Sequence, residues 1–303
     1  MRVFVWETGG KRRAVAVFGL GLVGGAIAET FTRRLDRPGR DLNYPWGDAA
    51  GRAEIRRDLS DLLSGSDSVD IVWSAGRSGF GSDTQTMATE TGLVRELVDF
   101  SQSLTPGDGA ASFHLLSSAG GLFEGISPIE RGSVPCPLRP YGTGKEAQEA
   151  LLSKTELRAH IYRPSSVYGY RRGARLGLVA ALLRNAQEGS VTRIAGANDT
   201  VRDYVLAEDM GQFIAARVLA AAPLPPAPLL LASGRPAAIG EIVAIVRRIV
   251  ERPVLLQYAT APDNARHMSF RPSALPKGWR PTALETGIRL TARSLLGDLR
   301  AAA

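Results

Sequence analysis

The chain has 303 residues, of which 44% are hydrophobic and 22% charged, and its formal net charge is +7. This composition is that of a globular protein large enough for one domain with a smaller lobe, and no apolar run approaches the roughly 18 residues of a membrane span. A single cysteine, Cys136, excludes an intrachain disulfide and a cysteine-based zinc cage, and the scattered basic residues argue against a nucleic-acid partner.

The first half of the chain alternates short apolar runs with amphipathic segments, which is typical of βαβ units and a parallel sheet. Strands are expected at 14–18, 69–73, 112–116 and around 160–163. Helices are expected from about residue 23, over 53–65, over 84–104 and from 141 to 154. The segment 36–50 is rich in Pro and Gly and predicts only a short or irregular second strand.

The second half is less regular. It predicts helices over 176–187 and 208–220, a hairpin-like piece at 189–196 and a Pro-rich connector at 221–230. Further short helices and loops are expected after the connector.

A G-x-G-x-x-G sequence follows the first predicted strand and opens the first helix. In that context, two glycines allow a tight turn and close approach of the backbone to a pyrophosphate, and the third lets helix and strand pack closely. The helix N-terminus offers N–H groups to the phosphates. We therefore expect NAD or NADP to contact Gly19, Gly21, Leu22, Val23 and Gly24.

The sequence leaves the choice between NAD and NADP open. Asp41 and Asp48 lie at roughly the distance after the glycines at which an acidic residue binds the adenosine ribose. Arg40 or Arg34 could instead bind a 2′-phosphate.

A second pattern, Tyr141-x-x-x-Lys145, places a phenol and an ammonium group on one helix face. The positive charge lowers the pKa of the Tyr from about 10, so the Tyr can exchange a proton with a hydroxyl or carbonyl during hydride transfer. Ser117 and Ser118 end the preceding predicted strand. Either hydroxyl could hold the reacting oxygen by a hydrogen bond.

These motifs occur in the order and spacing of the extended short-chain dehydrogenases, and the chain resembles the NAD-dependent epimerase/dehydratase family. The segment R-P-S-S-V-Y-G at 163–169 follows the Tyr–Lys helix as it does in that family. The sequence V-R-D-Y-V at 201–205, followed by Glu208-Asp209, and the sequence G-W-R-P-T-x-L-E-x-G at 278–287 are similar to two further family elements. The resemblance covers about residues 14–292.

The resemblance implies an α/β fold, a Rossmann-type doubly wound parallel sheet with a smaller C-terminal substrate-binding lobe. The NAD(P)-binding domain would span 1–165, its core continuing to about 230, and 166–303 would form mainly the lobe. Tyr141 would be the acid/base, Lys145 would orient the nicotinamide ribose, and Ser118 or Ser117 would be the hydroxyl partner. A homodimer through a helical bundle that includes the Tyr141 helix is also implied.

Further contacts are carried over residue by residue. Arg202 matches the arginine that binds the substrate diphosphate, and Arg–phosphate pairing is strong because it is bidentate. Additional cofactor contacts are expected at Ala75, Gly76, Arg163 and Pro164, and additional substrate contacts at Ser166 and Arg77.

The sequence departs from the family pattern at several positions, and one departure bears on which reaction is expected. The glycine motif is one residue shorter than usual, the loop after the serines reads AGGLFEG, and Gly144 stands where serine is usual. The Thr-Asp-Glu of the 4,6-dehydratases is absent, which argues against dehydration.

The resemblance favours a nucleotide-sugar epimerase that acts by transient hydride abstraction and return. A reductase or dehydrogenase with an exchangeable cofactor would use the same residues. A non-catalytic dinucleotide sensor or scaffold is disfavoured because Tyr141 and Lys145 are both present. We expect a cytoplasmic protein with a nucleotide-sugar substrate, no membrane partner and no metal, since His114, His160 and His267 are not spaced for a metal site.

Overall fold

A computed structural model describes residues 1–220, 228–259, 264 and 266–302, and the chain divides into two compact units. Unit 1 consists of Met1–Ser117, Pro137–Tyr162 and Gly211–Pro228, and unit 2 of Ser118–Cys136, Arg163–Met210 and Leu229–Ala303. Most of the predicted Pro-rich connector, 221–227, lies outside the described residues. No helix among the described residues is long and apolar enough to cross a membrane.

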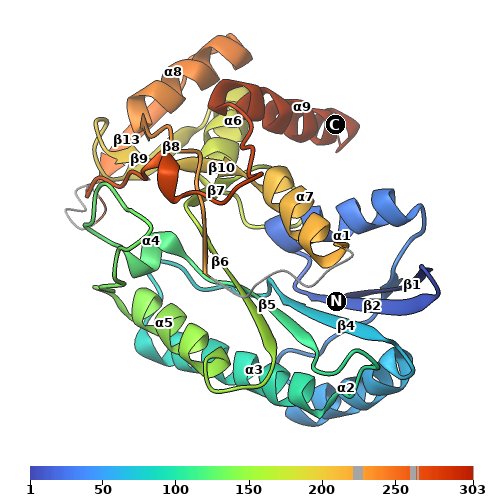
Figure 1. The fold of residues 1–303 in the computed structure, drawn as a ribbon. Helices are drawn as coiled ribbons and strands as arrows, with labels where there is room; N and C mark the ends of the chain where they lie inside the picture. Colours follow the sequence, from blue (N-terminus) through green and yellow to red (C-terminus); the bar gives the residue numbers. More distant parts are fainter. Residues whose placement is uncertain (221–227, 260–263, 265, 303) are drawn as a thin grey trace. The chain divides into compact units, whose positions relative to one another are not determined.

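Unit 1 is built on a sheet in which β2, β4, β5 and β6 run parallel. Its strands are β1 (Arg2–Thr8), β2 (Lys11–Phe18), β3 (Arg40–Asp41), β4 (Ser68–Trp73), β5 (Ser112–Leu116) and β6 (Arg158–Pro164), in the spatial order β6-β5-β4-β2-β1-β3. Its helices are α1 (Leu22–Leu35), α2 (Ala49–Leu63), α3 (Thr84–Ser103), α5 (Pro140–Leu152) and the part of α7 (Ala207–Val218) from Gly211 onward. Figure 1 shows α2, α3 and α5 on one face of this sheet and α1 with α7 on the other, a doubly wound arrangement that confirms the predicted fold class.

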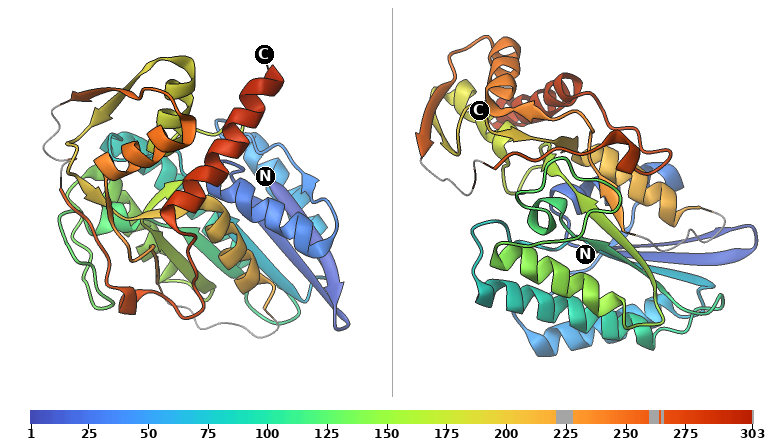
Figure 2. Two further views of the ribbon diagram at one scale, coloured as in Figure 1. Left: turned by 90° about the horizontal axis from the view of Figure 1, so that it is seen from above. Right: turned by 60° about the vertical axis from the view of Figure 1, so that its left-hand side comes forward.

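The sheet begins with a hairpin that the sequence patterns did not indicate. β1 pairs antiparallel with β2, and the two strands are joined by Gly9 and Gly10, which both have positive φ, 57° and 74°. Such a pair of residues is typical of the tight turns that join β-hairpins. Figure 2 shows this long hairpin at one edge of the sheet. The predicted second strand is only the two residues of β3, and it pairs with β1 rather than with β2.

Alternate side chains of the parallel strands build the core under α2, α3 and α5. Full burial of one large apolar side chain contributes roughly 1.5–3 kcal/mol, so this layer holds the sheet and the three helices together. The largest fully buried side chains of this core are Phe18, Leu59, Ile71, Trp73, Leu97, Phe113 and Leu115.

The opposite face of the same strands carries a buried polar cluster. His114, which is 1% exposed, lies 2.9 Å from the Asp70 carboxylate through Nε2 and 3.0 Å from the Tyr162 hydroxyl through Nδ1. The His114 ring also stacks on the His160 ring at 4.6 Å between centroids. Burial and the neighbouring His114 lower the pKa of His160 to about 3, so His160 stays neutral.

Replacing His114 with Val is expected to lower the free energy of unfolding by about 3 kcal/mol, because Asp70 and Tyr162 lose their buried partner. Urea unfolding followed by circular dichroism measures the loss. Adding Asp70→Val should recover part of it, since removing both partners leaves no uncompensated charge. A loss under about 1 kcal/mol in the single variant would contradict this account of the cluster.

Unit 2 combines small pairs of strands with a helical layer. Its elements are α4 (Ala119–Leu122), β7 (Ser166–Tyr168), α6 (Leu178–Glu188), β8 (Val191–Ala195), β9 (Val201–Arg202), β10 (Tyr204–Leu206), β11 (Leu229–Leu231), β12 (Ala237–Ala238), α8 (Ile239–Val250), β13 (Leu255–Ala259), a 3₁₀ turn at Pro272–Ala274 and α9 (Leu284–Ala302). One core joins α6, α8 and α9 to β7 and β10. The hairpin predicted at 189–196 is wrong: β8 instead pairs in parallel with β13, far along the chain.

Candidate active site

The glycine turn lies between the end of β2 and the start of α1. Gly19 has φ 84°, and a side chain on Gly19 would overlap the backbone of Ala75. A side chain on Gly24 would overlap the carbonyl oxygen of Gly19 and the Ser74 hydroxyl. Ser74 closes the turn by donating to the carbonyl oxygens of Phe18 and Gly19 at 2.9 and 2.7 Å. Gly19 and Gly24 are therefore fixed by packing within the protein itself.

Gly21 is different, because a Cβ atom there would meet no atom within 4 Å. Gly21 is the N-cap of α1 and makes no side-chain capping bond, so the first N–H groups of the helix depend on other partners. Open space at a helix N-terminus suits a pyrophosphate that approaches the backbone closely. The residues of this turn thus fit the phosphates of a dinucleotide.

The two glycines are expected to respond differently to alanine. Gly24→Ala should lower the free energy of unfolding by about 1–3 kcal/mol, because the added methyl overlaps the turn. Gly21→Ala should lower the free energy of unfolding by no more than about 1 kcal/mol, because alanine is a poorer N-cap than glycine but meets no clash, yet it should bind NAD at least tenfold more weakly. Thermal unfolding and calorimetric titration with NAD measure the two effects. Undiminished NAD affinity in Gly21→Ala would exclude this turn as the phosphate site.

A buried ion pair joins α3 to α5. Glu90 on α3 and Lys145 on α5 are 7% and 4% exposed, and their Oε1 and Nζ atoms are 2.9 Å apart. The side chain of Gln148 bonds both partners, at 3.0 Å to Lys145 and 3.2 Å to Glu90. The second Glu90 oxygen accepts the backbone N–H groups of Arg77 and Ser78, each at 3.1 Å. The loop after β4, predicted to contact the cofactor, is thus tied to Lys145 through one carboxylate.

The electrostatics of Glu90 follow from these contacts. Burial alone would raise the pKa of its carboxyl, but the Lys145 charge and the hydrogen bonds from Lys145, Ser78 and Gln148 outweigh burial and lower the pKa to about 2. Glu90 is therefore ionised at neutral pH, and the stability that this ionisation contributes is lost as the pH falls from the ordinary carboxyl range toward 2.

Tyr141 lies on the same helix as Lys145, and the Lys145 ammonium is 5.8 Å from the centre of the Tyr141 ring. The Tyr141 and Phe80 rings pack edge to face, with 5.7 Å between their centroids. The Arg139 guanidinium lies over the Phe80 ring, 5.0 Å from its centroid. The predicted proton-exchanging phenol and its charged neighbour are thus brought together as the motif spacing indicates.

Gly144 lies where α5 packs against α3. A Cβ atom on Gly144 would lie 3.0 Å from Cβ of Met87 and would overlap the terminal methyl of Met87, so a larger residue requires the Met87 side chain to shift. The glycine that stands in place of the usual serine therefore leaves room for Met87 between the two helices.

The two candidate serines have different bonds. Ser117 donates its hydroxyl hydrogen to Glu149 at 2.5 Å. Ser118 is the N-cap of α4 and accepts the N–H of Gly121 at 3.1 Å, which leaves its hydroxyl hydrogen for another acceptor. These bonds favour Ser118 over Ser117 as a donor to a substrate oxygen.

The predicted residues of unit 2 lie at the end of β6 and on the short strands β7 and β9. Arg163, near the end of β6, lies over the Phe123 ring at 5.5 Å, and Pro164 is the last residue of that strand. Ser166 starts β7, where its N–H bonds the carbonyl oxygen of Asp203. Arg202 on β9 donates to the carbonyl oxygen of Asn264 at 3.0 Å.

Comparison with known proteins identifies the group. The model of the NAD dependent epimerase/dehydratase family matches residues 47–224, more than half of the chain. The chain belongs to this family. The match confirms the resemblance carried by the motifs, although it begins after the glycine turn. No curated protein matches the sequence.

Several solved structures share the fold of this protein over nearly its whole length. MoeE5 in complex with UDP-glucose and NAD is 18% identical with a TM-score of 0.76, over 94% of this chain and 99% of that chain. UDP-glucose 4-epimerase of Thermus thermophilus is 18% identical with a TM-score of 0.72, over 94% and 99%. UDP-N-acetylglucosamine 4-epimerase of Methanobrevibacter ruminantium is 17% identical with a TM-score of 0.74, over 95% and 99%. At these identities the likeness shows a shared fold.

Sequence reasoning missed two buried carboxylates of this family member. Glu90 gave no signal because it stands alone in an ordinary amphipathic helix. Asp203 lies within the recognised V-R-D-Y-V element, and it accepts the hydroxyl of Ser165 at 2.9 Å and the N–H groups of Ser233 and Gly234 at 2.6 and 2.8 Å. Asp203 therefore ties the loop after β6 to the loop after β11.

The candidates for binding the adenosine ribose have other partners. The Asp41 carboxylate accepts two hydrogen bonds from Arg2, at 2.6 and 2.8 Å, and the bond from Arg2 lowers the pKa of Asp41. Asp48 caps α2 by accepting the N–H of Ala50.

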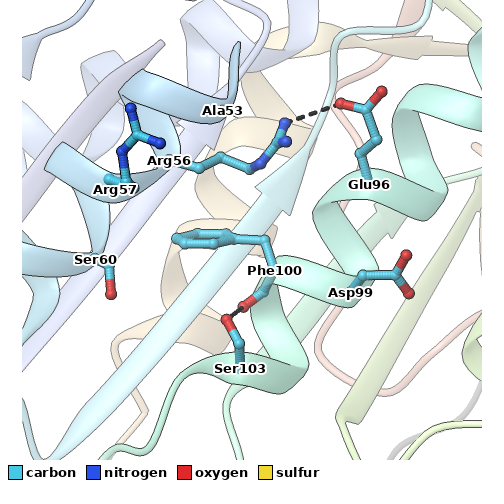
Figure 3. Close-up of a pocket in the computed structure, with 8 residues that line it drawn as sticks. All are labelled: Ala53, Arg56, Arg57, Ser60, Glu96, Asp99, Phe100 and Ser103. Atoms are coloured by element: carbon cyan, nitrogen blue, oxygen red, sulfur yellow. Dashed lines mark hydrogen bonds and ion pairs between the residues drawn. The ribbon is translucent and has the colours of Figure 1, made fainter. Parts of the chain in front are cut away.

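A hollow between α2 and α3 is lined by none of the predicted catalytic, cofactor-binding or substrate-binding residues. Figure 3 shows Arg56 directed to Glu96 across it, with Phe100 on α3 below. The guanidinium of Arg56 is held by Glu96 at 2.8 Å and by the Tyr44 hydroxyl at 3.1 Å.

No group of three or more His, Cys, Asp or Glu side chains suited to a metal ion occurs in the described part of the chain.

Proposed function

We propose that the protein is an NAD-dependent epimerase of a nucleotide sugar. The observation that carries this proposal is the buried, charged Lys145 beside Tyr141, in the same unit as a glycine turn that fits a dinucleotide phosphate. The family match supports NAD as cofactor. The solved proteins of similar fold include a UDP-glucose 4-epimerase with NAD and a protein that binds UDP-glucose with NAD, which supports the substrate class.

The chain's own residues then divide the work. The Lys145 charge favours the phenolate of Tyr141, which accepts the proton of a sugar hydroxyl and returns it after the carbon centre has inverted. NAD, when bound, supplies the reversible hydride acceptor that such an inversion requires. Ser118 donates a hydrogen bond to the reacting oxygen, and Arg202 binds the diphosphate. Ser166 and the Arg77 side chain are further proposed substrate contacts.

Tyr141→Phe is expected to lower kcat by about 10²–10⁴-fold, because the phenol can no longer move the proton, while NAD affinity stays unchanged. Interconversion of UDP-glucose, UDP-N-acetylglucosamine and UDP-glucuronic acid with their 4-epimers, followed by proton NMR, measures turnover. Tyr258→Phe, at an exposed tyrosine, is the matched control.

The outcomes separate the candidate functions. Undiminished turnover in Tyr141→Phe would refute the mechanism. Stoichiometric consumption of added NAD or NADPH in place of epimerisation would identify the reductase or dehydrogenase. Binding of NAD with no turnover of any of the three sugars would favour a sensor or a different sugar.

A homodimer is part of the proposal. A groove runs along α3 and α5 and the segment before α5, and small or apolar residues line much of it: Met87, Ala88, Gly92, Pro137, Leu138, Pro140, Gly144 and Ala147. Ala88 and Ala147 are exposed, and Leu138 is 51% exposed. Two helices with such a surface suit packing against the same pair in a second copy, because a two-fold interface uses one patch twice.

Ala147→Arg is expected to convert the dimer to a monomer, since a charge in the centre of an apolar contact is desolvated without a partner. Size-exclusion chromatography with light scattering measures the mass. Ala150→Arg, at an exposed position of α5 that does not line the groove, is the control. A wild-type protein that is monomeric at micromolar concentration would contradict this interface.

A further inference from the structure

Glu90 is a costly residue in its position. It is a buried side chain of α3, and removing a carboxylate from water is unfavourable unless charge and hydrogen bonds compensate. Its two oxygens receive four such contacts: Lys145 and Gln148 on one, and the N–H groups of Arg77 and Ser78 on the other. Each Glu90 oxygen therefore accepts two hydrogen bonds, and all four donors are Lys145 itself or groups that lie beside Lys145.

These contacts fix the direction of the lysine. An ammonium group has three N–H donors, and Lys145 gives one to Glu90 and one to Gln148. One donor remains, and the tetrahedral geometry of the nitrogen sets its direction once the other two are held.

The same carboxylate holds the loop that passes over the lysine. A Cβ atom on Gly76 would lie 3.0 Å from Glu90 Oε1 and 3.3 Å from Lys145 Nζ, so the backbone of the loop runs directly against the ion pair. One residue earlier, Ala75 packs against Gly19 of the glycine turn. Glu90 therefore connects the lysine, through the loop, to the turn that fits the dinucleotide phosphates.

We propose that Glu90 is a positioning residue of the cofactor site: it aims the remaining N–H of Lys145 at the nicotinamide ribose and offsets part of the lysine charge that acts on Tyr141. This role rests on the proposed function. Among the described residues, Lys145 lies beside the Tyr141 ring, Arg139 lies over the Phe80 ring that packs against Tyr141, and Glu90 on α3 pairs with Lys145.

Glu90→Gln removes the negative charge and keeps the size of the side chain. Because an amide has a single acceptor oxygen, it cannot hold both Lys145 and the two loop N–H groups. The lysine and the loop should lose their fixed arrangement, and NAD should bind at least tenfold more weakly.

The pH dependence should change as well. Without the offsetting carboxylate, the positive charge beside the reacting groups is greater, so both limbs of the kcat/KM profile move to lower pH. A purely structural contact would reduce activity at every pH without moving either limb.

The test compares wild type, Glu90→Gln and Glu96→Gln. Glu96 lies on the same helix and also loses an ion pair, with Arg52 and Arg56, but makes no contact with Lys145. NAD affinity is measured by calorimetry, and the kcat/KM profile from pH 5 to 10 is recorded on the sugar that wild type epimerises. Both changes are expected in Glu90→Gln alone. If either NAD affinity or the profile equals that of Glu96→Gln, the proposal is overturned.

The failure of the proposed function gives a different result. A wild type that binds NAD but epimerises none of the three sugars gives no kcat/KM profile, and the measured NAD affinities then decide the role of Glu90 by themselves. Should Glu90→Gln not fold, Glu90→Asp keeps the charge but shortens the reach to Lys145. Its NAD affinity should fall about tenfold with both limbs unmoved, and wild-type affinity would overturn the proposal.

Discussion

The close contact between α3 and α5 is the constraint on which the candidate site depends. At this contact Met87 of α3 packs against Gly144 of α5, and Glu90 and Lys145 form an ion pair at 2.9 Å. Because both charges are buried, neither is tolerated alone. The contact therefore sets the geometry of the site and at the same time makes the folded unit dependent on that geometry.

The sequence predicted the parts of this fold whose signals are local. Apolar runs and helical periodicity placed α1, α3, α5 and the parallel strands within a few residues of their observed bounds. The N-terminal hairpin was not predicted, because the sequence of β1 has no periodicity that marks it as an antiparallel strand added before β2. The pairing of β8 with β13 was also missed, since the two strands are separated by more than fifty residues and only tertiary packing joins them.

The residues of the candidate site were likewise predicted only where their signal is local in the sequence. Tyr141 and Lys145 were found because their spacing carries chemistry, whereas Glu90 is visible only once the helices are packed. In unit 2 the recognised motifs turn out to hold the fold. The Trp279 indole donates to the carbonyl oxygen of Ala232 at 2.7 Å, and a side chain on Gly287 would overlap the Tyr168 hydroxyl. Such motifs identify the family because the packing needs them, and they leave the identity of the substrate to side chains outside them.

The short edge strand has a consequence for association. β3 covers only Arg2 and Val3, so most of the outer side of β1 is without a partner strand among the described residues. An open strand edge is a template on which a foreign chain can add a strand. Here Arg37 donates to the carbonyl oxygen of Val5 at 3.4 Å, and the exposed charge of Glu7 lies further along the same strand. These charged side chains protect the edge against strand addition and amyloid-like growth.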